Sequence, residues 1–136
     1  MKKSITILVI LLAFLFVGCS SESGSTSQNT ISGQWKLIGV NGTFAGIHDT
    51  FPEGMITWDF NSLNQTVTVT NHNTDPNLFD VLETGVYNYH LLNVPGAPCD
   101  ESIDINGSVY GCYSVANDSL VIDQSVADGF AIILKH

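Results

Sequence analysis

The sequence predicts an all-β domain, an eight-stranded antiparallel up-and-down barrel. From Ile31 onward the chain consists of short runs in which apolar and polar residues alternate, which is the period-two pattern of half-buried strands. Turn-forming Asn, Gly, Asp and Pro residues separate these runs, and no segment shows convincing helical periodicity. Eight short strands joined mostly by hairpins can close on themselves and leave no exposed sheet edge. A two-sheet β-sandwich is the alternative that the same pattern allows.

Residues 1–18 precede the domain and have the composition of a signal peptide. Two lysines are followed by thirteen residues, 5–17, of which all but Thr6 are apolar. A membrane-spanning helix needs about 20 apolar residues, so a run of this length is typical of a signal-peptide core. The leader therefore predicts export.

The leader ends in Phe16-Val17-Gly18-Cys19, which resembles the lipobox of bacterial lipoproteins. The resemblance implies that the Cys19 thiol is lipidated, with palmitate as an expected acyl chain, and that the peptide is cut immediately before it. It also implies a lipid-anchored protein of the cell envelope, and Ser20 is compatible with transport to an outer membrane. An ordinary secretory signal or an uncleaved anchor is the alternative.

Residues 19–30 predict a disordered tether between the lipid anchor and the domain. Seven of the eleven residues in 20–30 are Ser or Thr and none is apolar, so nothing there can offset the entropy lost on ordering the backbone. The remaining 106 residues, 31–136, suffice for one domain with one core.

The charge of the mature chain excludes some classes of partner. Without residues 1–18, two lysines and no arginine stand against thirteen acids, which gives a net charge of −11. Such a chain cannot supply the phosphate contacts that nucleic acids require, and anionic headgroups would repel it. Attachment to the membrane is therefore expected through the lipid alone.

The expected strands follow one another with few long connections. Their approximate ranges are 34–40, 55–60, 65–71, 85–92, 101–105, 108–115, 119–123 and 129–135. Asn106-Gly107 and Asn117-Asp118 sit where two-residue hairpin turns need positive φ. In the longer link between the third and fourth strands, Asp75-Pro76-Asn77 predicts a single helical turn.

Alternation along these strands predicts an inward face that is rich in aromatic residues. Trp58, Phe60, Tyr87 and Tyr89 are the candidate ligand-binding residues, and the alternative is that they only fill the core. A solvent-open cavity of roughly 300 Å³ or more would favour ligand binding. The full set expected to face inward is Trp35, Leu37, Ile56, Trp58, Phe60, Val67, Val69, Tyr87, Tyr89, Leu91, Leu120, Ile122, Phe130, Ile132 and Leu134.

Two cysteines remain once Cys19 is lipidated, and we expect Cys99 and Cys112 to form a disulfide. In an oxidising compartment such a pair is typical of a structural bridge, and two sulfurs without nearby histidines are too few for a metal site. With a two-residue turn at 106–107, Cys112 is expected opposite Glu101, one diagonal step from Cys99.

A family resemblance becomes visible at the two ends of the domain. Gly33-x-Trp35-x-Leu37 resembles the opening of lipocalin-like domains, in which the Trp plugs the closed end of the barrel. Ser119–Asp123 followed by Phe130–Lys135 resembles the closing strands of small lipocalin-like lipoproteins of the Bacteroidota. The opening pattern with Asn41-Gly42 is also similar to that of META domains, another small β fold found in such lipoproteins.

The sequence contains no motif for a nucleophile, a phosphate loop or a His-x-x-x-His metal site, so neither an enzyme nor a cofactor or metal is expected. We expect a lipid-tethered barrel that binds a small neutral apolar or aromatic molecule. Because Lys36 and Lys135 are expected outside the barrel, a carboxylate would find no cation inside. The alternative is a non-catalytic structural or interaction module, with a solid barrel and acidic loops that contact a protein or glycan.

Overall fold

A computed structural model describes residues 30–42, 46–93, 95, 99, 101–124 and 129–136 of the chain. This part of the chain is all-β. Within these ranges no helix has the length and apolar character needed to cross a membrane. The strands are β1 (Gly33–Gly42), β2 (His48–Thr50), β3 (Ile56–Asn61), β4 (Thr66–Asn71), β5 (Gly85–Asn93), β6 (Glu101–Ile105), β7 (Ser108–Ala116), β8 (Ser119–Asp123) and β9 (Phe130–Lys135).

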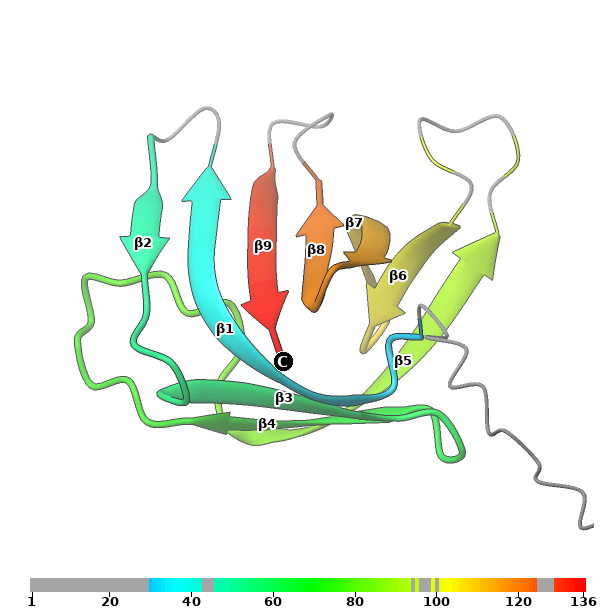
Figure 1. The fold of residues 1–136 in the computed structure, drawn as a ribbon, viewed down its shortest axis with the longest axis horizontal. Helices are drawn as coiled ribbons and strands as arrows, with labels where there is room; N and C mark the ends of the chain where they lie inside the picture. The colour runs from blue at the N-terminus through cyan, green and yellow to red at the C-terminus, as the bar shows by residue number, and fades with distance from the viewer. Residues whose placement is uncertain (1–29, 43–45, 94, 96–98, 100, 125–128) are drawn as a thin grey trace, which may run out of the picture.

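The sheet closes into a barrel, as the sequence predicted, and the sandwich alternative is excluded. Each strand from β3 to β9 pairs antiparallel with the next, and β9 pairs with β1 to complete the ring (Figure 1). Eight strands form the barrel and β2 is additional. Because closure pairs the first and last strands, the barrel proper has no free edge.

Strand β1 has two partners on one side because it bends along its length. Its first half, Gly33–Lys36, pairs with β3, whereas Gly39–Asn41 pairs with β2. The register with β9 shifts by one residue between Leu37 and Gly39, and the curvature of β1 is visible in Figure 1. Strand β2 was not predicted, since three residues are too few to show an alternating pattern.

The two predicted tight turns are confirmed by their backbone angles. Asn106 and Gly107 have φ of 55° and 83°, and Asn117 and Asp118 have φ of 48° and 61°. Positive φ at both central residues is the geometry that matches the right-handed twist of a hairpin. The predicted helical turn at Asp75 is wrong: the segment forms an isolated turn, in which the Leu78 amide donates a hydrogen bond to the Asp75 backbone carbonyl at 3.3 Å.

The core contains nearly all of the side chains that were expected to face inward. Trp35 and Trp58 lie opposite each other on β1 and β3, and both are fully buried. Tyr87 and Phe130 are partly buried and pack against this core. The core also contains residues that were not in the predicted set, namely Ile31, Val40, Phe51, Ile103 and Ile105.

Leu91 corrects one prediction of burial, since its side chain is 44% exposed. It lies on the same face of β5 as Tyr89, but β4 pairs only with the first part of β5, from Gly85 to Asn88. Tyr89, the next residue, is still buried, but Leu91 lies two residues further along and has no residue of β4 paired beside it, so alternation alone did not determine burial.

Candidate functional site

The two ends of the barrel differ in how completely they are filled. At one end, here called the closed end, Trp35 donates a hydrogen bond from Nε1 to the Ile31 carbonyl at 2.7 Å. The His136 ring stacks on Trp35 with ring centroids 3.7 Å apart. The closed end is therefore covered by packed and hydrogen-bonded side chains.

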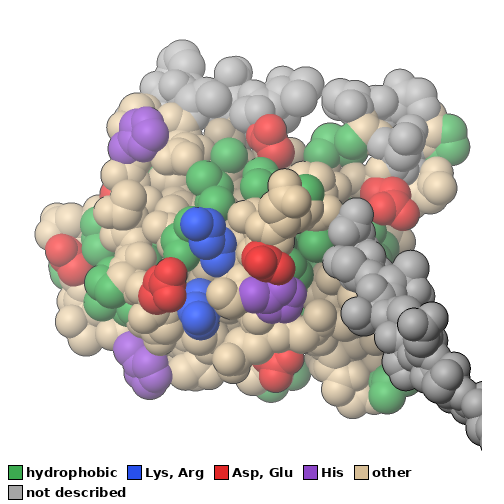
Figure 2. All heavy atoms as spheres, viewed as in Figure 1, with side chains coloured by type: hydrophobic (Ala, Val, Ile, Leu, Met, Phe, Trp, Pro, Cys, Tyr) green, Lys and Arg blue, Asp and Glu red, His purple; other side chains and the backbone are tan. Residues whose placement is uncertain are grey.

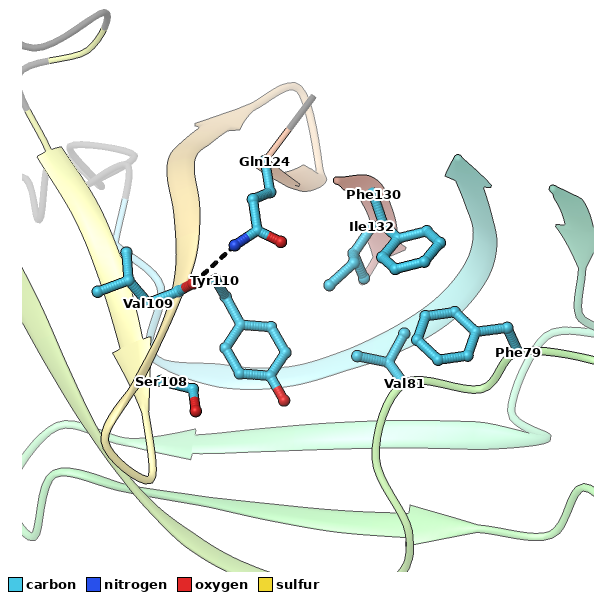
Figure 3. Close-up of a pocket in the computed structure, with 8 residues that line it drawn as sticks. All are labelled: Phe79, Val81, Ser108, Val109, Tyr110, Gln124, Phe130 and Ile132. Atoms are coloured by element: carbon cyan, nitrogen blue, oxygen red, sulfur yellow. Dashed lines mark hydrogen bonds between the residues drawn. The ribbon is translucent and has the colours of Figure 1, made fainter. Parts of the chain in front are cut away.

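The opposite end, here called the open end, contains a pocket of about 230 Å³. It lies among the start of β7, the start of β9 and the β4–β5 connection (Figure 3). Its lining residues are Phe79, Val81, Ser108, Val109, Tyr110, Gln124, Phe130 and Ile132. No lining side chain among the described residues is charged, so the pocket suits an uncharged guest.

The β4–β5 connection forms one wall of the pocket and is fixed from two directions. The Phe79 amide donates a hydrogen bond to Oδ2 of Asp49 on β2 at 2.8 Å. The Phe79 ring packs on Phe130 at the start of β9, with ring centroids 4.5 Å apart. The additional strand β2 thus positions a carboxylate that holds the pocket wall in place.

A second group of hydrogen bonds ties the same connection to the end of β4. Nδ2 of Asn71 donates to Oδ2 of Asp80 at 2.7 Å and to the Leu82 carbonyl at 3.0 Å. Nδ2 of Asn73 donates to the same Asp80 oxygen at 3.2 Å. Because this carboxylate is shared by two amides, the wall has a defined path across the barrel mouth.

Tyr110 forms the opposite wall, and its ring is directed into the pocket (Figure 3). Burial raises the pKa of Tyr110 above its usual value of 10, and the neighbouring Tyr87 raises it further. Nearby, Nε2 of Gln124 donates to the Val109 carbonyl at 2.9 Å, so this amide group is already engaged. The pocket therefore offers apolar walls and a neutral phenol.

None of the four predicted ligand-binding residues lines this pocket, although Tyr87 neighbours Tyr110. Trp58 is fully buried, and its Nε1 has no hydrogen-bond partner within the described part of the chain. Phe60 and Tyr89 are 2% and 3% exposed and meet edge to face with ring centroids 5.2 Å apart. Tyr87 packs against the core and donates its hydroxyl to the Glu83 carbonyl at 3.0 Å. Their role in binding stays a prediction.

Two more open grooves, of about 420 and 480 Å³, lie near the closed end. Phe60 borders the first, and Tyr89 and Leu91 border the second. The acidic side chains Asp59 and Glu101 line the two grooves, one in each. Neither groove combines enclosure with an uncharged lining as the open-end pocket does.

The predicted disulfide between Cys99 and Cys112 is confirmed, with Cα atoms 5.8 Å apart. The register expected for it is wrong by one residue, because Cys112 lies opposite Ser102 rather than Glu101. An extra residue in β7 causes this shift. Cys19, the leader and residues 20–29 of the tether lie outside the described residues.

The histidines do not gather into a metal site: within the described ranges, no group of three or more His, Cys, Asp or Glu side chains is placed to hold an ion. The two lysines of the domain, Lys36 and Lys135, face each other across β1 and β9 on the outside of the barrel. Figure 2 shows the lysines of this face surrounded by acidic side chains, and Nζ of Lys36 lies 3.7 Å from Glu53.

Comparisons with protein-family models, curated proteins and solved structures gave no match to this chain. The function of the site is therefore inferred from its geometry alone. Sequence reasoning missed most of the pocket residues because they lie on a connection, at strand ends and at an irregularity in β7. The sequence did contain one indication of the pocket, namely Phe79 and Val81 within an otherwise polar connection. Large apolar side chains in a loop are expected to pack against another apolar surface.

Proposed function

We propose that this chain is a lipid-anchored lipoprotein of the bacterial cell envelope, lipocalin-like in kind, whose barrel binds a small neutral apolar or aromatic molecule. The observation that carries the binding function is the pocket of about 230 Å³ at the open end, with its uncharged and mainly apolar lining. Pockets of this kind, with a few polar groups among apolar walls, are the usual form of small-molecule sites. The proposal includes no catalytic step.

The charge of the lining favours a neutral guest. Lys36 and Lys135 lie on the outer face, so no described lysine can neutralise an anion in the pocket. Burying an unpaired carboxylate costs several kcal/mol, which disfavours fatty acids and other organic anions. Neutral rings bind without this cost.

The volume of the pocket favours a guest with about one ring. A cavity of about 150 Å³ lined by Leu, Ile and Phe is large enough to hold benzene in another protein. At about 230 Å³ the pocket is smaller than the roughly 300 Å³ that was expected to favour ligand binding, so its volume supports only a guest of one ring with a small substituent. A long acyl chain is not expected to fit.

Binding is tested by titrating the full chain, held in lipid nanodiscs, with benzamide and with benzoate. These molecules have nearly the same shape, but only benzoate is charged at neutral pH. We expect benzamide to shift the methyl NMR signals of Val81 and Ile132, and benzoate to bind at least tenfold more weakly. Both compounds can also partition into the lipid of the nanodisc. A control variant of the protein separates this effect from binding in the pocket, since partition into lipid does not depend on the pocket residues.

The control variant is Ser108→Lys, which adds a flexible cation at an exposed position of the pocket lining. It is expected to strengthen benzoate binding several-fold and to leave benzamide binding within about twofold, since the attraction is electrostatic. If benzoate bound more tightly than benzamide to the unchanged protein, the assignment of a neutral ligand would be wrong.

Anchoring is supported by the apolar leader and by Cys19 directly after Gly18. Mass spectrometry of protein extracted from membranes is expected to find an N-terminal cysteine that carries acyl chains. A mature chain that begins at another residue and carries no lipid would contradict this part of the proposal. The binding function would be unaffected, since it depends on the barrel alone.

The filled interior favours a second candidate function, an interaction module. The indoles of Trp35 and Trp58 are fully buried, so the middle of the barrel is solid. In that case the acidic outer surface contacts a protein or glycan partner and the end pocket has no role. Failure of both benzamide and benzoate to shift the pocket methyl signals would favour this candidate.

A further inference from the structure

A β-bulge in β7 determines where the Tyr110 side chain lies. Ile103 of β6 pairs with Gly111, and the next residue, Asp104, pairs with Val109, so Tyr110 is the extra residue. Bulges of this kind redirect a side chain and are frequent beside functional sites. As a result Tyr110 and Tyr113, three residues apart, both pack against the core, which a regular strand would not allow.

The bulge depends on Gly111. This residue has φ of 113°, and a Cβ added to it would lie 2.3 Å from the Asp123 carbonyl oxygen on the neighbouring strand. Any other residue would therefore clash with the backbone of β8, which cannot move without breaking its own pairing. The chain thus holds Tyr110 in place with a position that only glycine satisfies.

The hydroxyl of Tyr110 differs from those of its neighbours in having no protein partner. Tyr87 donates to the Glu83 carbonyl at 3.0 Å, and Tyr113 donates to Oε2 of Glu101 at 2.9 Å. Among the described residues, none hydrogen-bonds to the Tyr110 hydroxyl, although the ring is half-buried and lines the pocket. The hydroxyl is not among the buried polar atoms that lack a partner, so it reaches solvent and is available to a guest in the pocket.

We propose that Tyr110 is a specificity-determining residue of the open-end pocket, and that the ligand class is a single apolar ring carrying one neutral hydrogen-bonding group. This inference rests on the proposed function, because it requires that the pocket binds a small molecule. A phenol, an aromatic ketone or a cyclic alcohol fits this class, whereas a plain hydrocarbon leaves the hydroxyl without a partner. A tyrosine hydroxyl keeps its proton at neutral pH, so Tyr110 can donate a hydrogen bond to a guest.

The test compares p-cresol with p-xylene, which differ only by a hydroxyl in place of a methyl group. The full chain in lipid nanodiscs is titrated with each, and the methyl signals of Val81 and Ile132 report the affinity. After correction for partition of each compound into empty nanodiscs, the unchanged protein is expected to bind p-cresol about fivefold more tightly, as one neutral hydrogen bond contributes.

Tyr110→Phe removes only the hydroxyl and is expected to bring the ratio of the two affinities to about one, with p-xylene binding unchanged within about twofold. Tyr113→Phe is the matched control, because its hydroxyl bonds to Glu101 and does not line the pocket. That variant is expected to keep the ratio of the unchanged protein. Continued binding of p-xylene shows that each variant is folded.

The outcomes separate this inference from the function on which it rests. Equal binding of p-cresol and p-xylene to the unchanged protein would overturn the role of Tyr110 and leave a binding pocket. The same holds if Tyr110→Phe keeps the preference for p-cresol. If neither compound shifts the methyl signals, the binding function itself is wrong, and the inference is wrong with it.

Discussion

The closed and open ends of the barrel use similar aromatic side chains for different purposes. At the closed end Trp35 is fully buried, its N–H is hydrogen-bonded and His136 stacks on its ring. At the open end Phe79 and Phe130 pack on each other but stay partly exposed, and the Tyr110 hydroxyl lacks a partner among the described residues. At the closed end the Trp35 N–H is satisfied, whereas the N–H of the buried Trp58 opposite it has no partner within the described ranges. The open end differs in that its unpartnered group, the Tyr110 hydroxyl, belongs to a residue that lines a pocket.

This difference shows that access to a pocket distinguishes a candidate binding residue from a core aromatic residue. An unpaired polar group does not, since Nε1 of the fully buried Trp58 is also without a partner among the described residues. Apolar contact alone does not, since Trp35 and Phe130 both pack into the same hydrophobic cluster. The distinction predicts that changes at the closed end affect stability more than binding, and that changes at the open end do the reverse. Three experiments test its consequences for stability.

The largest effect is expected from a pair of alanine substitutions, one at each end. Trp35→Ala should lower the free energy of unfolding by about 3–5 kcal/mol, because it leaves a large cavity and an unpaired carbonyl at Ile31. Phe130→Ala removes a side chain that is only partly buried, and should cost about 1–2 kcal/mol. Urea unfolding followed by circular dichroism measures both, and equal losses would contradict the proposed difference between the ends.

A smaller effect is expected where β2 holds the pocket wall. Asp49→Ala removes the acceptor of the Phe79 amide. It should lower the free energy of local opening of the pocket wall by about 1–2 kcal/mol, and the Phe79 amide should exchange its hydrogen faster. The Trp35 indole at the closed end should keep its exchange rate. Asp59→Ala on β3 is the control, because this exposed carboxylate makes no hydrogen bond or ion pair within the described residues. Unchanged exchange at Phe79 would show that β2 does not fix the wall.

The smallest effect expected is a pH dependence of stability, and it arises from Tyr113 in the half of β7 nearer the closed end. Burial, together with the hydrogen bond to Glu101, raises the pKa of Tyr113 from 10 to about 12. Between these values the unfolded chain has released a proton that the folded protein still holds. The contribution of Tyr113 to the free energy of unfolding should therefore be fully present below pH 10 and fall as the pH rises toward 12. Urea unfolding at several pH values between 10 and about 12 measures how steeply the free energy of unfolding falls with pH. Tyr113→Phe should make this fall less steep, and an unchanged fall would show that groups other than Tyr113 cause it.

Much of the fold was predictable because strands and tight turns depend on local sequence. Alternation located the eight barrel strands, and Asn106-Gly107 and Asn117-Asp118 located two turns whose positive φ is confirmed. Strand β2 was not predictable, since three residues carry no period and their pairing depends on the bend in β1. The exposure of Leu91 depends likewise on where β4 stops pairing, which no local pattern records.

The candidate site was less predictable than the fold, for a physical reason. The aromatic residues with the clearest alternation, Trp58 and Phe60, are buried because regular alternation is what places a side chain in a packed core. The pocket is formed where regularity ends, by Phe79 on a connection and by Tyr110 at a bulge. Gly111 followed by Cys112 was the available signal of that irregularity, since glycine inside a strand often marks a bulge.

The bulge in β7 also makes the placement of Tyr110 depend on the length of that strand. Deleting one residue between Val109 and Gly111 would restore an unbroken ladder with β6, and the barrel would close as before. Its mouth would then present a different side chain and no phenol. In a barrel of this architecture, a one-residue gap between the hairpin turn and Cys112 would therefore mark a chain that has kept the scaffold and lost the phenol to which we assign the recognition of a polar group.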